Sequence, residues 1–184
     1  MTEYPNKREE SDLARLNRSA LLLEYGTIGW NVGEAVLTIA LGTLASSLAL
    51  IGFGTVSVIE VFASAVVVWH LLPGHSTASP ERTARAHRLV GAAFGVLAMA
   101  LAVAGVRDLV TGRRPDESPW GIAYLAITAL VMFGLAFAKK RIAARLDSSP
   151  LRSEATMTLL DGVLATATMV GLLLNAVAGW WWAD

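Results

Sequence analysis

Five polar side chains lie within long apolar stretches of this sequence and could take part in binding a cation. They are Glu24, Asn31, Glu34, Glu60 and Asp161. An ionisable side chain at bilayer depth costs about 2.5 to 3.5 kcal/mol even on insertion scales, so it needs a partner, water or a function. Carboxylate and amide oxygens are also ligands that hard divalent cations accept. These residues are therefore the candidates for chemistry.

The polar residues of the first apolar stretch recur at helical spacing. Steps of three and four residues separate the members of this series, which are Glu24, Thr27, Asn31, Glu34 and Thr38. This spacing places them on one face of a helix. We expect that face to contact protein or water, because lipid contact would expose two carboxylates and an amide to hydrocarbon.

Two interpretations compete for these side chains. Buried amides, hydroxyls and protonated carboxyls can join helices by hydrogen bonds, and for Asn31 and Glu34 this packing role and a functional role both stay open. For Glu60 and Asp161 we favour a function, because Asn or Gln would join helices without the risk of ionisation. Glu154 is interpreted as a first-turn acid that the helix dipole favours.

The apolar stretches are long enough to be helices that cross a membrane. About 20 apolar residues span the roughly 30 Å of hydrocarbon. The sequence predicts five spans, at about residues 20–44, 48–72, 89–110, 120–138 and 155–182. The period-two alternation of transmembrane strands is absent. The predicted fold class is all-α, a polytopic membrane helix bundle in which residues 20–184 form one transmembrane domain.

Composition excludes several classes of protein. Hydrophobic residues make up 54% of the 184 and charged residues 16%, whereas soluble domains carry about 25% charge. Fifteen Lys and Arg balance fifteen Asp and Glu, so no surplus of positive charge is available to bind nucleic acid. The lack of Cys excludes thiolate sites. Because motifs of soluble enzymes are also absent, we expect neither an enzyme nor a resident cofactor.

The basic residues predict an orientation in the membrane. If residues 1–19 form a cytoplasmic segment, the cytoplasmic side carries Lys7, Arg8, Arg15, Arg18, Arg82, Arg85, Arg88, Lys139, Lys140, Arg141, Arg145 and Arg152. The opposite side carries only Arg107, Arg113 and Arg114. Since Lys and Arg concentrate in cytoplasmic loops, the N-terminus is predicted to be cytoplasmic. This count treats Lys139 as the start of a polar connection that runs to Glu154.

Several segments resemble the transmembrane region of one known family. They read LEYGTIGWNVGEA at 23–35, SLALIGFGTVSVIEVFASAVVVWHLL at 47–72, SPLRSEATMTLLDGVLA at 149–165 and LLLNAVAGWWWAD at 172–184. The resemblance is to the cation diffusion facilitator (cation efflux) family, nearest to a bacterial branch. It implies a divalent cation/proton antiporter of the bacterial plasma (inner) membrane and a homodimer with six spans per subunit. We therefore expect a chain cut before a sixth span.

The resemblance also implies a transport site. The family places two acids four apart on the second span, which fall on Val56 and Glu60, and a His and an Asp four apart on the fifth, which fall on Met157 and Asp161. One acid and the His are thus replaced. Asn31 and Glu34 could complete an oxygen-rich site, and Met157 could add a soft ligand if it turns inward.

Two functions follow from this ligand set. The first is efflux of a divalent cation, such as zinc, manganese, iron or cobalt, by exchange for protons through a midplane carboxylate site. The expected partners are then the metal ion, protons, membrane lipid and a second copy of the chain. The alternative is a non-transporting relative that acts as a membrane dimer partner or regulator, because two of the four family ligands are missing.

Overall fold

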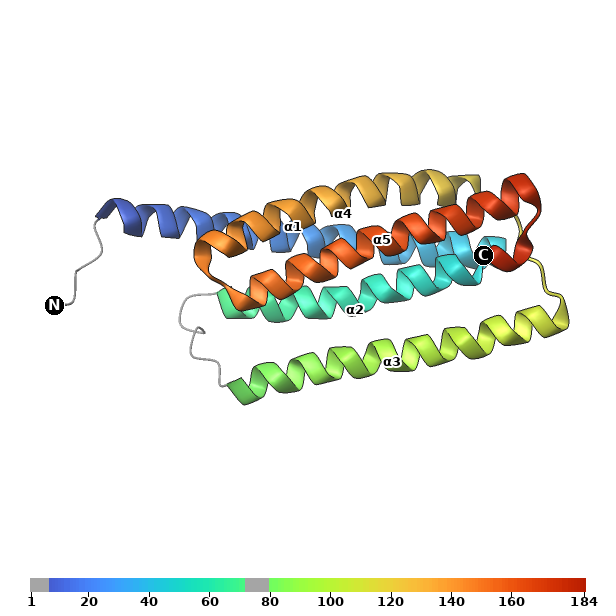
Figure 1. Cartoon of the computed structure of the whole chain (residues 1–184), viewed down its shortest axis with the longest axis horizontal. Helices are drawn as coiled ribbons and strands as arrows, with labels where there is room; N and C mark the ends of the chain where they lie inside the picture. Colours follow the sequence, from blue (N-terminus) through green and yellow to red (C-terminus); the bar gives the residue numbers. More distant parts are fainter. Residues whose placement is uncertain (1–6, 72–79) are drawn as a thin grey trace.

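The computed structural model describes residues 7–71 and 80–184, which form helices and no strand (Figure 1). The helices are α1 (Lys7–Ala45), α2 (Leu48–Leu71), α3 (Pro80–Thr111), α4 (Pro119–Leu146), α5 (Ser149–Ala178) and the short 3-10 helix η1 (Trp181–Ala183). Each of the five long helices is apolar enough, over a sufficient length, to cross a membrane. The prediction of an all-α polytopic helix bundle is confirmed.

Four of the long helices form a bundle, and the third lies outside it. α1 packs against α2 and α4, while α5 packs against α4 and α2, so these four helices close a ring. α3 packs against α2 along one side of that ring (Figure 1). The side chains that point into the ring come from α1, α2, α4 and α5, and this interior holds the polar residues described below.

Helix ends occur where the backbone adopts a left-handed conformation or a capping side chain is present. Ser46 (φ 53°) separates α1 from α2, and Asp147 (φ 47°) ends α4. Ser148 then caps α5, its hydroxyl accepting from the Leu151 N–H at 3.4 Å. Gly179 (φ 66°) ends α5, a conformation that glycine adopts without steric cost.

Several helices extend beyond the spans expected from the sequence. α1 begins at Lys7 and not near residue 20, and α4 continues from residue 138 to Leu146. α5 starts at Ser149 and stops at Ala178, because Gly179 breaks the helix before residue 182. Residue 72, the expected end of the second span, lies outside the described residues.

The interior of the ring is tightly packed at one end. Leu50, Phe53, Leu125, Ala165 and Leu172 form a buried apolar cluster contributed by α2, α4 and α5. α1 and α2 approach closely at Gly54, where an added Cβ would overlap the Thr38 hydroxyl and the Ile39 side chain. This approach brings the polar face of α1 against α2.

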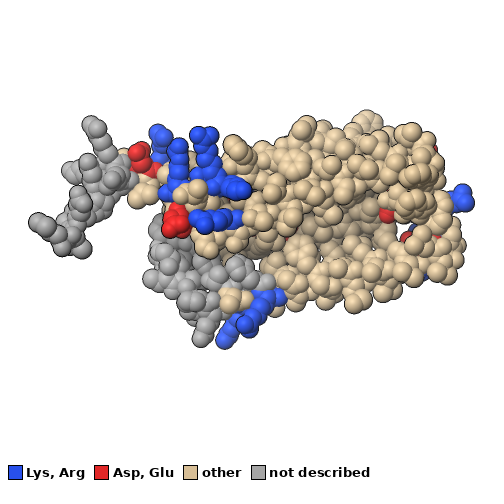
Figure 2. Space-filling view, in the orientation of Figure 1, with Lys and Arg blue, Asp and Glu red and all other residues tan. Residues whose placement is uncertain are grey.

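Exposed basic residues concentrate at one end of the bundle (Figure 2). The up-and-down order places there the start of α1, α3 and α5 and the end of α2 and α4 (Figure 1). Among the side chains that the structure describes, the exposed cations of this end, which we call the basic end, are Arg15, Arg18, Arg85, Arg88, Lys140, Arg141, Arg145 and Arg152. Arg107, Arg113 and Arg114 are exposed at the opposite end. The distribution is the one that the positive-inside rule associates with a cytoplasmic basic end.

Candidate functional site

The polar face of α1 points into the ring. Glu24, Asn31 and Glu34 are each 0% exposed, as are Thr38 on the same helix and Ser57 on α2. The helical spacing of these residues therefore indicated their position correctly. Buried polar groups need hydrogen-bond partners or neutralisation. The Thr38 hydroxyl donates to the backbone oxygen of Glu34, whereas the carboxylates and the amide need a side chain, a proton or a bound cation.

Two hydrogen bonds connect this face of α1 to α2. The Asn31 Nδ2 donates to the Glu60 carboxylate at 3.0 Å, and the Ser57 hydroxyl donates to the Glu34 carboxylate at 2.9 Å. Glu60 is 5% exposed and lies three residues, slightly less than one turn, beyond Ser57 on α2. The structure thus brings three of the predicted site residues, Asn31, Glu34 and Glu60, to one helix interface.

Asp161 of α5 is the least satisfied polar side chain of the interior. It is 1% exposed, and neither of its carboxylate oxygens has a hydrogen-bond partner among the described residues. Glu60 interacts electrostatically with Asp161 and with Glu34. Asn31 Oδ1 and one Glu34 oxygen also lack partners within the described part of the chain. The interior therefore holds several carboxylate and amide oxygens that are free to accept.

The two positions at which the family ligands are replaced differ in burial. Val56, one turn before Glu60 on α2, is buried. Met157, one turn before Asp161 on α5, is only half-buried. A buried Val at the first position contributes no ligand, and a half-buried Met at the second is a common filler of irregular packing.

The candidate ligands are not arranged as a closed coordination shell. Within residues 7–71 and 80–184, no group of three or more His, Asp or Glu side chains is placed so that it could hold a metal ion. Asn31, Glu34, Glu60 and Asp161 share the ring interior, and their role as ligands stays a prediction, as does that of Met157.

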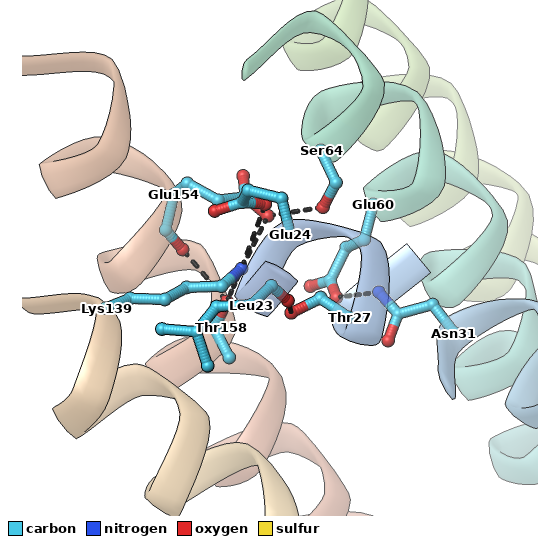
Figure 3. A network of polar contacts seen from close by, with 9 residues as sticks. All are labelled: Leu23, Glu24, Thr27, Asn31, Glu60, Ser64, Lys139, Glu154 and Thr158. Atoms are coloured by element: carbon cyan, nitrogen blue, oxygen red, sulfur yellow. Dashed lines mark hydrogen bonds and ion pairs between the residues drawn. The ribbon is translucent and has the colours of Figure 1, made fainter. Parts of the chain in front are cut away.

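A second polar cluster, centred on Lys139, was not expected from the sequence. Lys139 of α4 is 0% exposed, and its ammonium donates to Glu24 Oε2 at 3.2 Å, Glu154 Oε1 at 3.3 Å and Thr158 Oγ1 at 3.1 Å (Figure 3). The Ser64 hydroxyl of α2 donates to Glu154 Oε1 at 2.5 Å. All four helices of the ring contribute to this cluster.

This cluster corrects two interpretations drawn from the sequence. Lys139 does not begin a polar connection, because α4 continues to Leu146 and turns this side chain into the ring. Glu154 is not a first-turn acid, since α5 begins at Ser149, and its carboxylate contacts Lys139 and Ser64. Both interpretations assumed a polar connection from Lys139 to Glu154, whereas most of these residues belong to the end of α4 and the start of α5.

Comparison with known proteins places this helical bundle in a family. Residues 27–184 match the family described as Cation efflux transmembrane domain. The chain belongs to the cation efflux family. It is also 28% identical over 183 residues to an uncharacterized transporter of Synechocystis sp., in a match that covers 93% of this chain and 56% of that protein. The chain thus spans about half the length of the curated relative it matches. Membership in the cation efflux family agrees with the resemblance seen in the sequence.

Proposed function

We propose that this chain moves a divalent metal cation across the membrane in exchange for protons, with Glu60 and Asp161 at the core of the binding site. The observation that carries the proposal is Asp161, a buried carboxylate that has no hydrogen-bond partner on either oxygen within residues 7–71 and 80–184 and that interacts electrostatically with Glu60. Such an arrangement is costly at bilayer depth unless a cation or proton neutralises it. Membership in the cation efflux family supports the same conclusion.

The available ligands favour cations that accept oxygen. Glu60 and Asp161 supply carboxylates. Asn31 and Glu34, on the polar face of α1, each add an oxygen that has no hydrogen-bond partner among the described residues. Zinc prefers imidazole and thiolate, whereas manganese and iron(II) accept carboxylate and amide oxygens readily. We therefore place manganese and iron(II) ahead of zinc and cobalt as substrates.

Exchange for protons follows from the charge of the site. Carboxylates that are gathered in a low-dielectric interior repel one another, so the site is most stable when a cation or protons neutralise it. Metal and protons then compete for the same oxygens. Rocking of packed helices about a midplane site would expose it to each side in turn.

Metal flux into liposomes tests this function. Full-length protein would be reconstituted into vesicles that contain a fluorescent metal chelator, with manganese or zinc added outside. We expect metal entry that requires the protein and that alkalinises the lumen in step with the metal, because protons leave the vesicle in exchange. If vesicles with the protein take up metal at the same rate as protein-free vesicles, the result would favour a non-transporting dimer partner or regulator.

The missing acid of α2 offers a second test. Val56 lies one turn from Glu60, so an acid at this position would project from the same helix face. Val56→Asp is expected to raise the affinity for manganese, because a bound cation offsets the cost of the second carboxylate. The measurement is the metal-induced rise in melting temperature in detergent, which should exceed that of the parent. Equal shifts would mean that this face of α2 does not line a cation site.

Orientation is tested by reporters in two turns. Asp147 lies between α4 and α5, at the basic end, and Arg114 lies between α3 and α4, at the opposite end. We expect a reporter inserted after Asp147 to behave as cytoplasmic and one after Arg114 as external, as the positive-inside rule requires. An external signal after Asp147 would reverse the proposed placement in the bacterial inner membrane.

We also propose that the chain acts as a homodimer, as the family resemblance implies. α3 exposes large apolar side chains along its length, among them Leu89, Val96, Met99, Val103 and Val110. Lipid or a second copy of the chain would cover them in a membrane.

A further inference from the structure

The Lys139 cluster holds a cation, which is the ammonium group of Lys139 itself. An ammonium has three N–H donors, and those of Lys139 have three acceptors, on Glu24, Glu154 and Thr158 (Figure 3). The four side chains are each at most 3% exposed. The acceptors come from α1 and α5, and the cation from α4. The ring therefore encloses a complete cation-binding pocket, and a lysine occupies it.

The lysine leaves this pocket short of positive charge. Two carboxylates, Glu24 and Glu154, face one ammonium, so their formal sum with both acids ionised is one negative charge. The Glu24 side chain is 0% exposed, and its Oε1 has no hydrogen-bond partner among the described residues. A divalent cation would neutralise both carboxylates and could use this oxygen.

We propose that Glu24 and Glu154 form a second cation site, which the ammonium of Lys139 occupies as a tethered substitute for a divalent metal ion. The other groups at the site are the hydroxyls of Ser64 and Thr158, which contact Glu154 or Lys139 directly. All of these ligands are oxygens. Oxygen-only sites suit manganese or magnesium better than zinc.

The second site lies between the Glu60–Asp161 pair and the basic end. On α5, Glu154 precedes Asp161 by seven residues, which corresponds to about 10 Å of helix. On α1, Glu24 precedes Asn31 by the same interval, and on α2, Ser64 follows Glu60 by four residues. Because α1 and α5 start at the basic end and α2 ends there, all three offsets point toward that end (Figure 1).

This position gives Lys139 a role in transport, which rests on the proposed function. A metal ion that enters from the basic end reaches Glu24 and Glu154 before it reaches Glu60 and Asp161. It can bind there only when the Lys139 ammonium leaves the two carboxylates. Lys139 therefore closes this end of the ring. Only a cation that binds Glu24 and Glu154 strongly enough to displace the ammonium can enter.

The test removes the tethered cation and measures metal binding by stability. Lys139→Met would be purified with Mn²⁺ present throughout, treated with chelator, and melted in detergent with and without added Mn²⁺. We expect saturating Mn²⁺ to raise its melting temperature by about 5–10 °C more than that of the parent. The matched control is Lys140→Met, which removes the exposed neighbouring lysine and should respond as the parent does.

Two further variants show which carboxylates bind the metal. Lys139→Met combined with Glu24→Gln and Glu154→Gln should lose the added response. Lys139→Met combined with Glu60→Gln should keep it, and this outcome holds even if the Glu60–Asp161 pair does not support transport. The proposal is overturned if Lys139→Met responds to Mn²⁺ no more than the parent, or if the response disappears with Glu60→Gln. It is also overturned if Lys139→Met does not fold in Mn²⁺ while the triple variant folds.

Discussion

Glu60→Gln and Asp161→Asn are each expected to lower metal flux into liposomes at least 100-fold while the protein still folds. The amide retains the size of the carboxyl group, and Gln at position 60 can still accept the hydrogen bond that Asn31 donates. Each substitution removes the negative charge that attracts a cation. Without that charge the site neither competes for metal nor exchanges metal for protons.

The flux measurement needs a control that removes a carboxylate elsewhere. Asp147→Asn provides it, because Asp147 lies in the exposed turn between α4 and α5 and contacts only Arg152 among the described ion pairs. This variant should transport as the parent does. If Glu60→Gln and Asp161→Asn also transport at the parental rate, the cation does not pass between these residues.

The second large effect is expected at Lys139. In chelator-treated protein, Lys139→Met should lower stability by about 3–5 kcal/mol, because removal of one partner leaves buried charges without compensation. The variant leaves Glu24 and Glu154 facing each other at 0% and 3% exposure. The melting temperature in detergent should fall by about 10 °C or more.

The same loss should be reversed when the acids are neutralised together with the lysine. The combination of Lys139→Met, Glu24→Gln and Glu154→Gln leaves no formal charge in the cluster, so its melting temperature should return toward that of the parent. Lys140→Met, which alters an exposed side chain, should change the melting temperature little. A Lys139→Met protein that melts with the parent would show that no ammonium is held between these carboxylates.

The sequence predicted the polar interior because the membrane makes polar placement costly. Glu24, Asn31 and Glu34 recur at helical spacing in an apolar stretch, and a stripe of this kind cannot face lipid. All three are buried in the ring. Asp161 was likewise identified from a single carboxylate within an apolar segment. The burial of these side chains followed from the properties of the bilayer alone.

The partners of these residues could not be read from the sequence, because they depend on which helices become neighbours. Glu24 forms an ion pair with Lys139 of α4, and Asn31 and Glu34 form hydrogen bonds with side chains of α2. A signal for Lys139 was nevertheless present. It follows Met132 by seven residues and Ala136 by three, so it lies on the buried face of α4. Buried acids also require a cation, and a lysine on that face supplies one.

The location of a bound metal ion would show directly whether Glu60 and Asp161 bind the transported cation. Crystals of the full-length protein grown with Mn²⁺ would be measured at a wavelength at which manganese scatters anomalously. We expect a peak in the anomalous map within coordination distance of the carboxylates of Glu60 and Asp161, and loss of that peak in Asp161→Asn. A manganese peak that lies elsewhere in the transmembrane bundle, with none at this pair, would contradict this expectation.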